Sequence, residues 1–74
     1  MEHGRIVSDP AIMMGKPVIR GSRIPVEHLL RKLGHGITIE QLLEDYPHIS
    51  AQDVLAAQVF AADYMAGERI EAAE

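Results

Sequence analysis

Apolar positions repeat with the period of an α-helix in the middle of the chain. After Pro25 they fall on Val26, Leu29, Leu30 and Leu33, which share one helix face. A proline can open a helix because its missing N–H would be unpaired there in any case. The pattern therefore predicts a first helix from Pro25 to about Leu33, ended by the glycine that follows.

A second helix has the clearest start signal in the sequence. Thr38 is a good N-cap residue, and Gln41 three residues later completes a capping box. Apolar residues at positions 39, 42, 43 and 46 share one face. The sequence therefore predicts a short helix between Thr38 and Pro47, where the proline ends it.

The third helix is predicted to be the longest. Ser50 is its N-cap, and Asp53 lies near the positive end of the helix dipole. The helix is expected to run to about Met65, with Gly67 as its stop. A short helix, a brief turn and a longer helix form a helix-turn-helix unit, and the first helix completes a three-helix core over residues 25–66.

Both sides of this third helix are apolar. Most of its apolar residues fall on one side, but Phe60 lies nearly opposite them, with Tyr64 and Ala57 beside it. One side can pack on the first two helices, and the other needs either the N-terminal arm or a second chain. We therefore expect Phe60, Tyr64 and Ala57 to form an interface. A chain this short buries only ~60% of the surface that its unfolded form exposes, which favours a homodimer or a complex with another protein.

The segment before the helices, residues 5–24, is predicted to be an extended arm. It contains two short β-prone runs and a turn signal at Asp9-Pro10. Gly21-Ser22 suits a tight turn with positive φ at the glycine. These runs predict a short N-terminal β element.

One mainly α domain is therefore expected over residues 1–74. It consists of the arm at residues 5–24, the helix-turn-helix core at residues 25–66 and a tail at residues 67–74 that is expected to fray.

The charge of the chain is unevenly distributed. Its formal net charge of −4 argues against a simple nucleic-acid binder. Residues 1–36, however, carry six basic and three acidic residues, whereas residues 37–74 carry one basic and eight acidic residues. The two halves therefore present opposite charge to a partner.

Composition also limits the compartment. The absence of cysteine excludes disulfides and cysteine-containing zinc sites, and it fits a reducing environment. The start of the chain is polar, unlike an export signal, and the longest apolar runs are far shorter than the ~20 residues of a membrane span. We expect a cytoplasmic protein that does not contact a membrane.

No constellation of residues predicts an enzyme. Gly15-Lys16 is followed by Pro17, so the segment is not a phosphate-binding loop. The serines lack the setting of a nucleophile, and the four histidines lack the spacing of a metal site. We therefore expect no catalytic residue, no metal and no cofactor.

The most informative polar segment runs from Arg20 to Arg23. It is either a charged hairpin turn or a loop that presents two arginines to an anion, because a guanidinium pairs in a bidentate way with phosphate or carboxylate. The segment alone leaves open whether the anion belongs to nucleic acid or to an acidic protein site. Gln52, near the start of the third helix, can pair with an adenine edge, although residues 50–66 contain no lysine or arginine. The candidate binding residues are Lys16, Arg20, Gly21, Ser22, Arg23, Arg31, Lys32 and Gln52.

Two runs of the sequence resemble the signatures of a bacterial family. The first is GKPVIRGSRIPV at residues 15–26, and the second joins LLEDYPHIS at residues 42–50 to DVLAA at residues 53–57. They resemble the family called domain of unknown function 433, over roughly residues 5–66. Ser22 stands where this family usually has threonine.

The resemblance implies a homeodomain-like helical fold with a small N-terminal β element. Members are often encoded beside PIN-like ribonuclease toxins and are considered antitoxins. The resemblance implies no catalytic residue, because the family has none that is agreed.

Three hypotheses of function follow. The first is an antitoxin-type protein that neutralises a PIN-like ribonuclease toxin, with Arg20 or Arg23 inserted among the carboxylates of the nuclease, and that binds its own operator DNA as a dimer. The second is a stand-alone DNA-binding transcriptional regulator, whose affinity would fall steeply with salt. The third is a purely structural dimerisation module, which the two-sided third helix supports.

Overall fold

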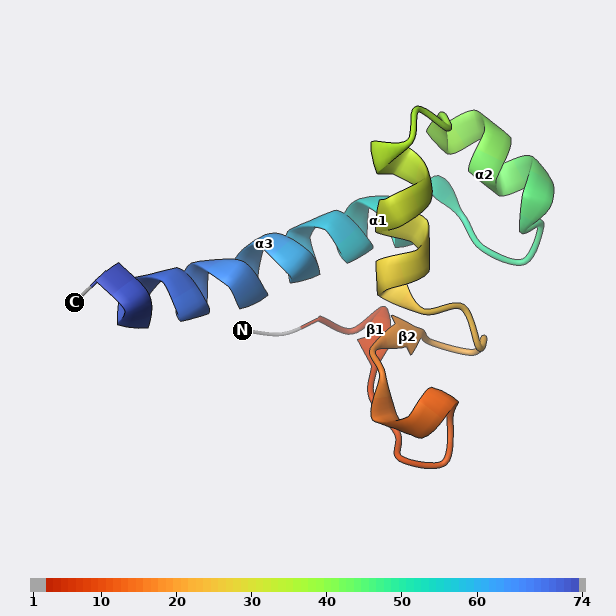
Figure 1. Cartoon of the computed structure of the whole chain (residues 1–74). Helices are drawn as coiled ribbons and strands as arrows, with labels where there is room; N and C mark the ends of the chain where they lie inside the picture. The colour runs from red at the N-terminus through yellow and green to blue at the C-terminus, as the bar shows by residue number, and fades with distance from the viewer. Residues whose placement is uncertain (1–2, 74) are drawn as a thin grey trace.

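Three helices follow a small two-stranded sheet in the computed structural model, which describes residues 3–73 and the side chains of residues 3–67. The elements are β1 (Ile6–Val7), the 3-10 turn η1 (Met13–Gly15), β2 (Val18–Ile19), α1 (Val26–Gly34), α2 (Ile39–Asp45) and α3 (Ala51–Ala73). The prediction of a mainly helical chain with a short N-terminal β element is confirmed. Figure 1 shows α1 crossing the N-terminal part of α3, while the rest of α3 extends beyond the other elements.

The starts of α2 and α3 lie where the sequence predicts them. Thr38 Oγ1 accepts a hydrogen bond from the Gln41 N–H at 3.1 Å, and Gln41 Oε1 accepts one from the Thr38 N–H at 3.0 Å. Asp53 has the corresponding role in α3, because its Oδ2 accepts from the Ser50 N–H at 2.9 Å and its own N–H donates to Ser50 Oγ at 3.3 Å. Bonds between residues three apart therefore fix both helix starts.

The end of α1 differs slightly from the prediction. Gly34 is the last residue of α1, and the chain leaves the helix at Gly36, which has a φ of 99°. The Gly36 N–H donates to Leu33 O at 3.0 Å, and the Ile37 N–H donates to Lys32 O at 3.1 Å. This is the bond pattern of a Schellman turn, which favours glycine at the left-handed position.

The last helix, α3, is longer than predicted. It passes through Gly67 and continues to Ala73, so the prediction that Gly67 ends the helix is wrong, and residues 67–73 are helical where a frayed tail was expected. Glu74 lies outside the described residues. A glycine inside a helix costs only about 1 kcal/mol relative to alanine, and no proline follows it to stop the helix.

The N-terminal arm folds back on itself as a sheet. β1 and β2 are antiparallel, with Ile6 opposite Ile19. Beyond β2 the Ser22 N–H donates to Ile19 O at 3.0 Å, and Gly21 has a φ of 81°. A positive φ at the third residue is what a type II turn requires. The predicted positive φ at Gly21 is therefore confirmed, but the two central residues of the turn are Arg20 and Gly21, one position before the predicted Gly21-Ser22 pair.

The hydrophobic core lies where β1, β2 and the three helices meet. Residues from all of these elements and from the loop before α3 are buried together: Ile6, Ile19, Val26, Leu29, Leu42, Ile49, Val54 and Ala57. The fully buried part of the core therefore reaches only the first two turns of α3, and the half-buried Phe60 on the next turn packs against it. Within residues 3–73, none of the helices combines the length and the apolar character that a membrane crossing requires.

Candidate partner-binding surface

The turn between β2 and α1 is held rigidly by its own hydrogen bonds. Ser22 Oγ donates to Ile19 O at 2.8 Å and accepts from the Ile24 N–H at 3.0 Å. The Ile19 N–H donates to Ile24 O at 3.0 Å, which closes the hairpin. Ser22 and the left-handed Gly21 therefore shape this turn, and the two arginines beside them are presented by a fixed backbone.

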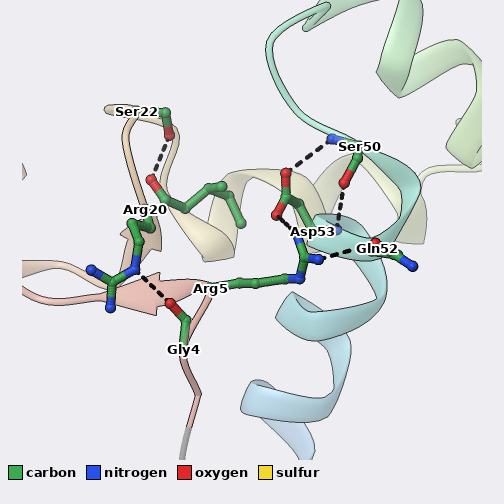
Figure 2. A network of polar contacts seen from close by, with 8 residues as sticks. Gly4, Arg5, Arg20, Ser22, Ser50, Gln52 and Asp53 are labelled. Atoms are coloured by element: carbon green, nitrogen blue, oxygen red, sulfur yellow. Dashed lines mark hydrogen bonds and ion pairs between the residues drawn. The ribbon is translucent and has the colours of Figure 1, made fainter.

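The arginines of this turn differ in how much of the guanidinium is used. Arg20 Nε donates to Gly4 O at 2.6 Å, which ties the turn to the chain before β1. Figure 2 shows the two terminal nitrogens of Arg20 pointing away from that contact. Arg23 is exposed and forms no hydrogen bond or ion pair with any side chain that the structure describes. Nine of the ten guanidinium N–H groups of Arg20 and Arg23 thus have no partner among the described residues and can bind an anionic partner.

Met13, one of two strained and exposed methionines in η1, lies next to Arg23. Met13 and Met14 have φ values of 50° and 59°, and Gly15 follows with 86°. The Met14 side chain is 93% exposed, and Met13 lines a shallow hollow together with Arg23 and Tyr46. Positive φ is unfavourable for residues that have a Cβ, and such strain is found most often at functional sites. We call Met13, Met14, Arg20 and Arg23 the arginine–methionine surface.

The start of α3 is closed by a contact that the sequence patterns did not indicate. Arg5 Nη1 donates to Asp53 Oδ1 at 2.9 Å, and Arg5 Nη2 donates to Gln52 Oε1 at 3.0 Å. Figure 2 shows Arg5, the residue just before β1, reaching to this helix end. Gln52, a predicted partner-binding residue, is therefore already engaged within its own chain.

Asp53 is held in its charged form by this arrangement. Its partial burial alone would raise the pKa of the carboxyl group, because a charge is less stable away from water. The hydrogen bonds from the Ser50 backbone and from Arg5 outweigh burial, so that the pKa of Asp53 is below its ordinary value of 3.8. The end of α3 that would face DNA in a recognition helix thus carries a carboxylate paired with an arginine of the same chain.

The other predicted basic residues lie elsewhere. Lys16 Nζ pairs with Glu27 Oε2 at 3.1 Å, and both side chains are about half exposed. Arg31 and Lys32 are in the last turn of α1, where a positive charge stabilises the negative end of the helix dipole. Because the hairpin turn lies at the opposite end of α1, the structure does not bring Arg31 and Lys32 together with the arginine–methionine surface.

The expected interface on α3 is partly inside the protein. Ala57 is completely buried in the core of its own chain, so its prediction as an interface residue is wrong. Its neighbour Phe60 is half-buried and meets the His3 ring edge-on at 5.1 Å, so the N-terminal arm covers part of it. Tyr64 stacks on Phe60 at 6.4 Å but remains exposed.

A groove beside Tyr64 remains open. Leu30 and Val26 of α1 form one wall, and Phe60, Tyr64 and Met65 of α3 form the other.

Among the side chains described by the structure, no three His, Asp or Glu residues lie close enough together to hold a metal ion.

Comparisons with known proteins identify similar chains and one similar fold. The model of a family described as "Protein of unknown function (DUF433)" matches residues 6–61. The uncharacterized protein y4eO of Sinorhizobium fredii is 34% identical over 56 residues, which are 76% of this chain and 25% of that protein. This chain thus spans about a quarter of the length of that relative.

A solved structure has the same arrangement of elements. It is the crystal structure of a DUF433 member protein from Anabaena variabilis, with a TM-score of 0.79 and 30% sequence identity. The similarity covers 95% of this chain and 69% of that chain.

Proposed function

We propose that this chain, which belongs to the DUF433 family of proteins of unknown function, is an antitoxin-type binding protein that neutralises a PIN-like ribonuclease. The observation that carries the proposal is the arginine–methionine surface. It combines guanidinium N–H groups that have no partner in the described structure, on a turn fixed by hydrogen bonds, with the exposed methionines of η1. Such a surface suits a partner with an acidic cavity and an apolar rim.

The arginines provide the inhibitory chemistry. Nucleases of this kind use carboxylates that hold a divalent metal, and a guanidinium can pair with a carboxylate through two parallel N–H···O bonds. Arg23, together with the terminal nitrogens of Arg20, would enter the acidic site and take the place of the metal. Because the turn is already fixed by Ser22, little conformational entropy is lost on binding.

The methionines provide the adjacent contact. Methionine side chains are flexible and polarizable, so that they adapt to irregular apolar surfaces. Met14 is almost completely exposed, and Met13 borders the hollow that also contains Arg23. Burial of these side chains against the nuclease would add affinity to the specificity of the ion pairs.

The test uses two charge-matched double variants of the full chain. Arg20→Ala with Arg23→Ala removes two positive charges from the turn, and Arg31→Ala with Lys32→Ala removes two from the far end of α1. Each is co-expressed with the proteins encoded by the neighbouring reading frames, co-purified, and assayed for inhibition of RNA cleavage by a nuclease that co-purifies with the wild type. We expect the turn variant to lose inhibition by roughly a hundredfold or more, since each charge-assisted bond contributes about 1.5–3 kcal/mol. The α1 variant should inhibit like the wild type. Equal potency of the turn variant and the wild type would refute the proposal.

Operator DNA binding is a second candidate function, with α2 and α3 as a homeodomain-like helix-turn-helix. A short helix joined to a longer one by residues 46–50 favours it. The charges oppose it, because Asp53 and the engaged Gln52 occupy the end of α3 that would read bases. Phosphate contacts would have to come from the hairpin arginines, so the affinity of the chain for its own promoter DNA should fall steeply from 50 to 200 mM salt. Absence of this binding, or binding insensitive to salt, would remove the candidate.

A further inference from the structure

The outer face of α3 carries an apolar stripe that nothing in the described chain covers. Leu55 and Val59 are 51% and 56% exposed, and Ala62 and Ala66 on the next turns are exposed too. The four positions are separated by 4, 3 and 4 residues, which is the spacing of a helix-pairing seam. No charged residue occurs between positions 54 and 62. We call these four residues the outer stripe.

The outer stripe is a different surface from the interface that the sequence predicted. At 100° per residue, the four positions of the stripe cluster on one side of α3, and Phe60 and Tyr64 lie on the far side. The far side already has neighbours, since Phe60 contacts His3 and the core. Figure 1 shows that the C-terminal part of α3 projects past the other elements, so most of its length has no helix beside it.

We propose that a second copy of this chain binds the outer stripe, with the two α3 helices antiparallel. The order of side-chain sizes along the stripe supports this occupant. Two large residues come first and two small ones follow. In an antiparallel pair centred between positions 59 and 62, Leu55 packs on the partner subunit's Ala66 and Val59 on the partner subunit's Ala62. Each large side chain then faces a small one, and the contact is the same from both subunits, as a two-fold dimer requires.

Charge supports the same direction. Residues 63–74 contain four acidic residues and one basic residue. A parallel pair would place the two acidic segments side by side, with repulsion between them. In the antiparallel pair the centres of these two segments lie about 24 Å apart along the helices, beyond the screening length of about 8 Å at physiological salt. The dipoles of two antiparallel helices that lie side by side also attract each other, because the positive end of each helix lies beside the negative end of the other.

The first experiment measures the mass of the full chain in solution over a concentration series, by sedimentation equilibrium. The wild type should be a dimer. Val59→Glu places a charge in the seam and should raise the Kd of the dimer by about a hundredfold or more. Tyr64→Glu is the matched control, because Tyr64 is equally exposed on the same helix but faces away from the stripe. Circular dichroism checks that both variants keep the wild-type helix content. A wild type that stays monomeric, or a dimer that Tyr64→Glu dissociates and Val59→Glu does not, would overturn the proposal.

The second experiment tests the direction of the helices. The chain has no cysteine, so introduced ones report only the chosen contacts. Leu55→Cys with Ala66→Cys in one chain should give a disulfide-linked dimer on oxidation, whereas Leu55→Cys alone should not. Positions 55 and 66 are about 16 Å apart along one helix, too far for a bond within a chain. Crosslinking of Leu55→Cys with itself would overturn the antiparallel arrangement.

Discussion

Two regions of this molecule use arginine in opposite ways. At the start of α3, Arg5 donates a hydrogen bond to Asp53 and another to Gln52. These partners follow Arg5 by 48 and 47 positions in the chain. At the hairpin turn, Arg20 uses one N–H for the backbone of Gly4, and Arg23 uses none among the described side chains. Arginines of the first kind hold the fold together, and arginines of the second kind remain available to a partner.

This contrast corrects a simple interpretation of charge. The N-terminal half of the chain has a basic excess, but the structure divides its basic residues among different tasks. Lys16 pairs with Glu27, and Arg31 and Lys32 lie in the last turn of α1, at the negative end of the helix dipole. The number of positive charges in a segment therefore does not measure its binding surface. What matters is which of them the chain itself has left unsatisfied.

The largest expected effect comes from removing the contact between Arg5 and Asp53 at the start of α3. Asp53→Ala removes the carboxylate that accepts from the Ser50 N–H and from Arg5, so the free energy of unfolding should fall by about 2 kcal/mol. This corresponds to a decrease of roughly 8–16 °C in Tm for a domain of this size. Glu40→Ala, which removes an acidic residue from the first turn of α2, is the control and should change Tm little. Thermal unfolding at one fixed protein concentration measures the Tm of both variants. Equal decreases in Tm would contradict the conclusion that the Asp53 carboxylate stabilises the start of α3.

A second prediction uses pH to separate the charge of Asp53 from its shape. Because the folded state holds the pKa of Asp53 below 3.8, ionised Asp53 stabilises the fold above the pKa of the unfolded chain. This contribution is lost as the pH falls through the lower, folded value. Asp53→Asn should therefore unfold at a lower temperature than the wild type above about pH 5, and the difference should shrink as the pH approaches 3.

The control for this pH series is Asp45→Asn, at the end of α2, which should leave the pH dependence of Tm as in the wild type. A gap between wild type and Asp53→Asn that is equally large at pH 7 and pH 3 would show that charge is not the cause.

The same contrast explains what the sequence could predict. The starts of α2 and α3 could be predicted because each is fixed by two residues three positions apart, Thr38 with Gln41 and Ser50 with Asp53. The turn at Gly21 could be predicted for the same reason, since its conformation depends on local residues. The bond from Arg5 to Asp53 could not, because no pattern along the chain relates residues so far apart.

The faces of α3 were only partly predictable. The sequence shows apolar residues on both sides of this helix, but it does not show which side meets the rest of the chain. The structure places Ala57 in the core and leaves Leu55 and Val59 outside. Gly67 was a misleading signal, because the penalty of one glycine is small beside the hydrogen bonds of the long helix that contains it.

The smallest expected effect concerns the strained backbone of Met14 in the arginine–methionine surface. Met14 has a φ of 59°, and a glycine there would relieve the strain at some cost in the entropy of the unfolded chain. Met14→Gly should therefore raise the free energy of unfolding by about 0.5–1 kcal/mol, measured by urea denaturation. Met14→Ala removes the same exposed side chain but keeps the strain, so its stability should match that of the wild type. A loss of stability in the glycine variant, or an equal gain in both, would refute this account of the loop.

If both variants bind the nuclease more weakly, the side chain makes the contact. If only the glycine variant does, the strained backbone positions the surface.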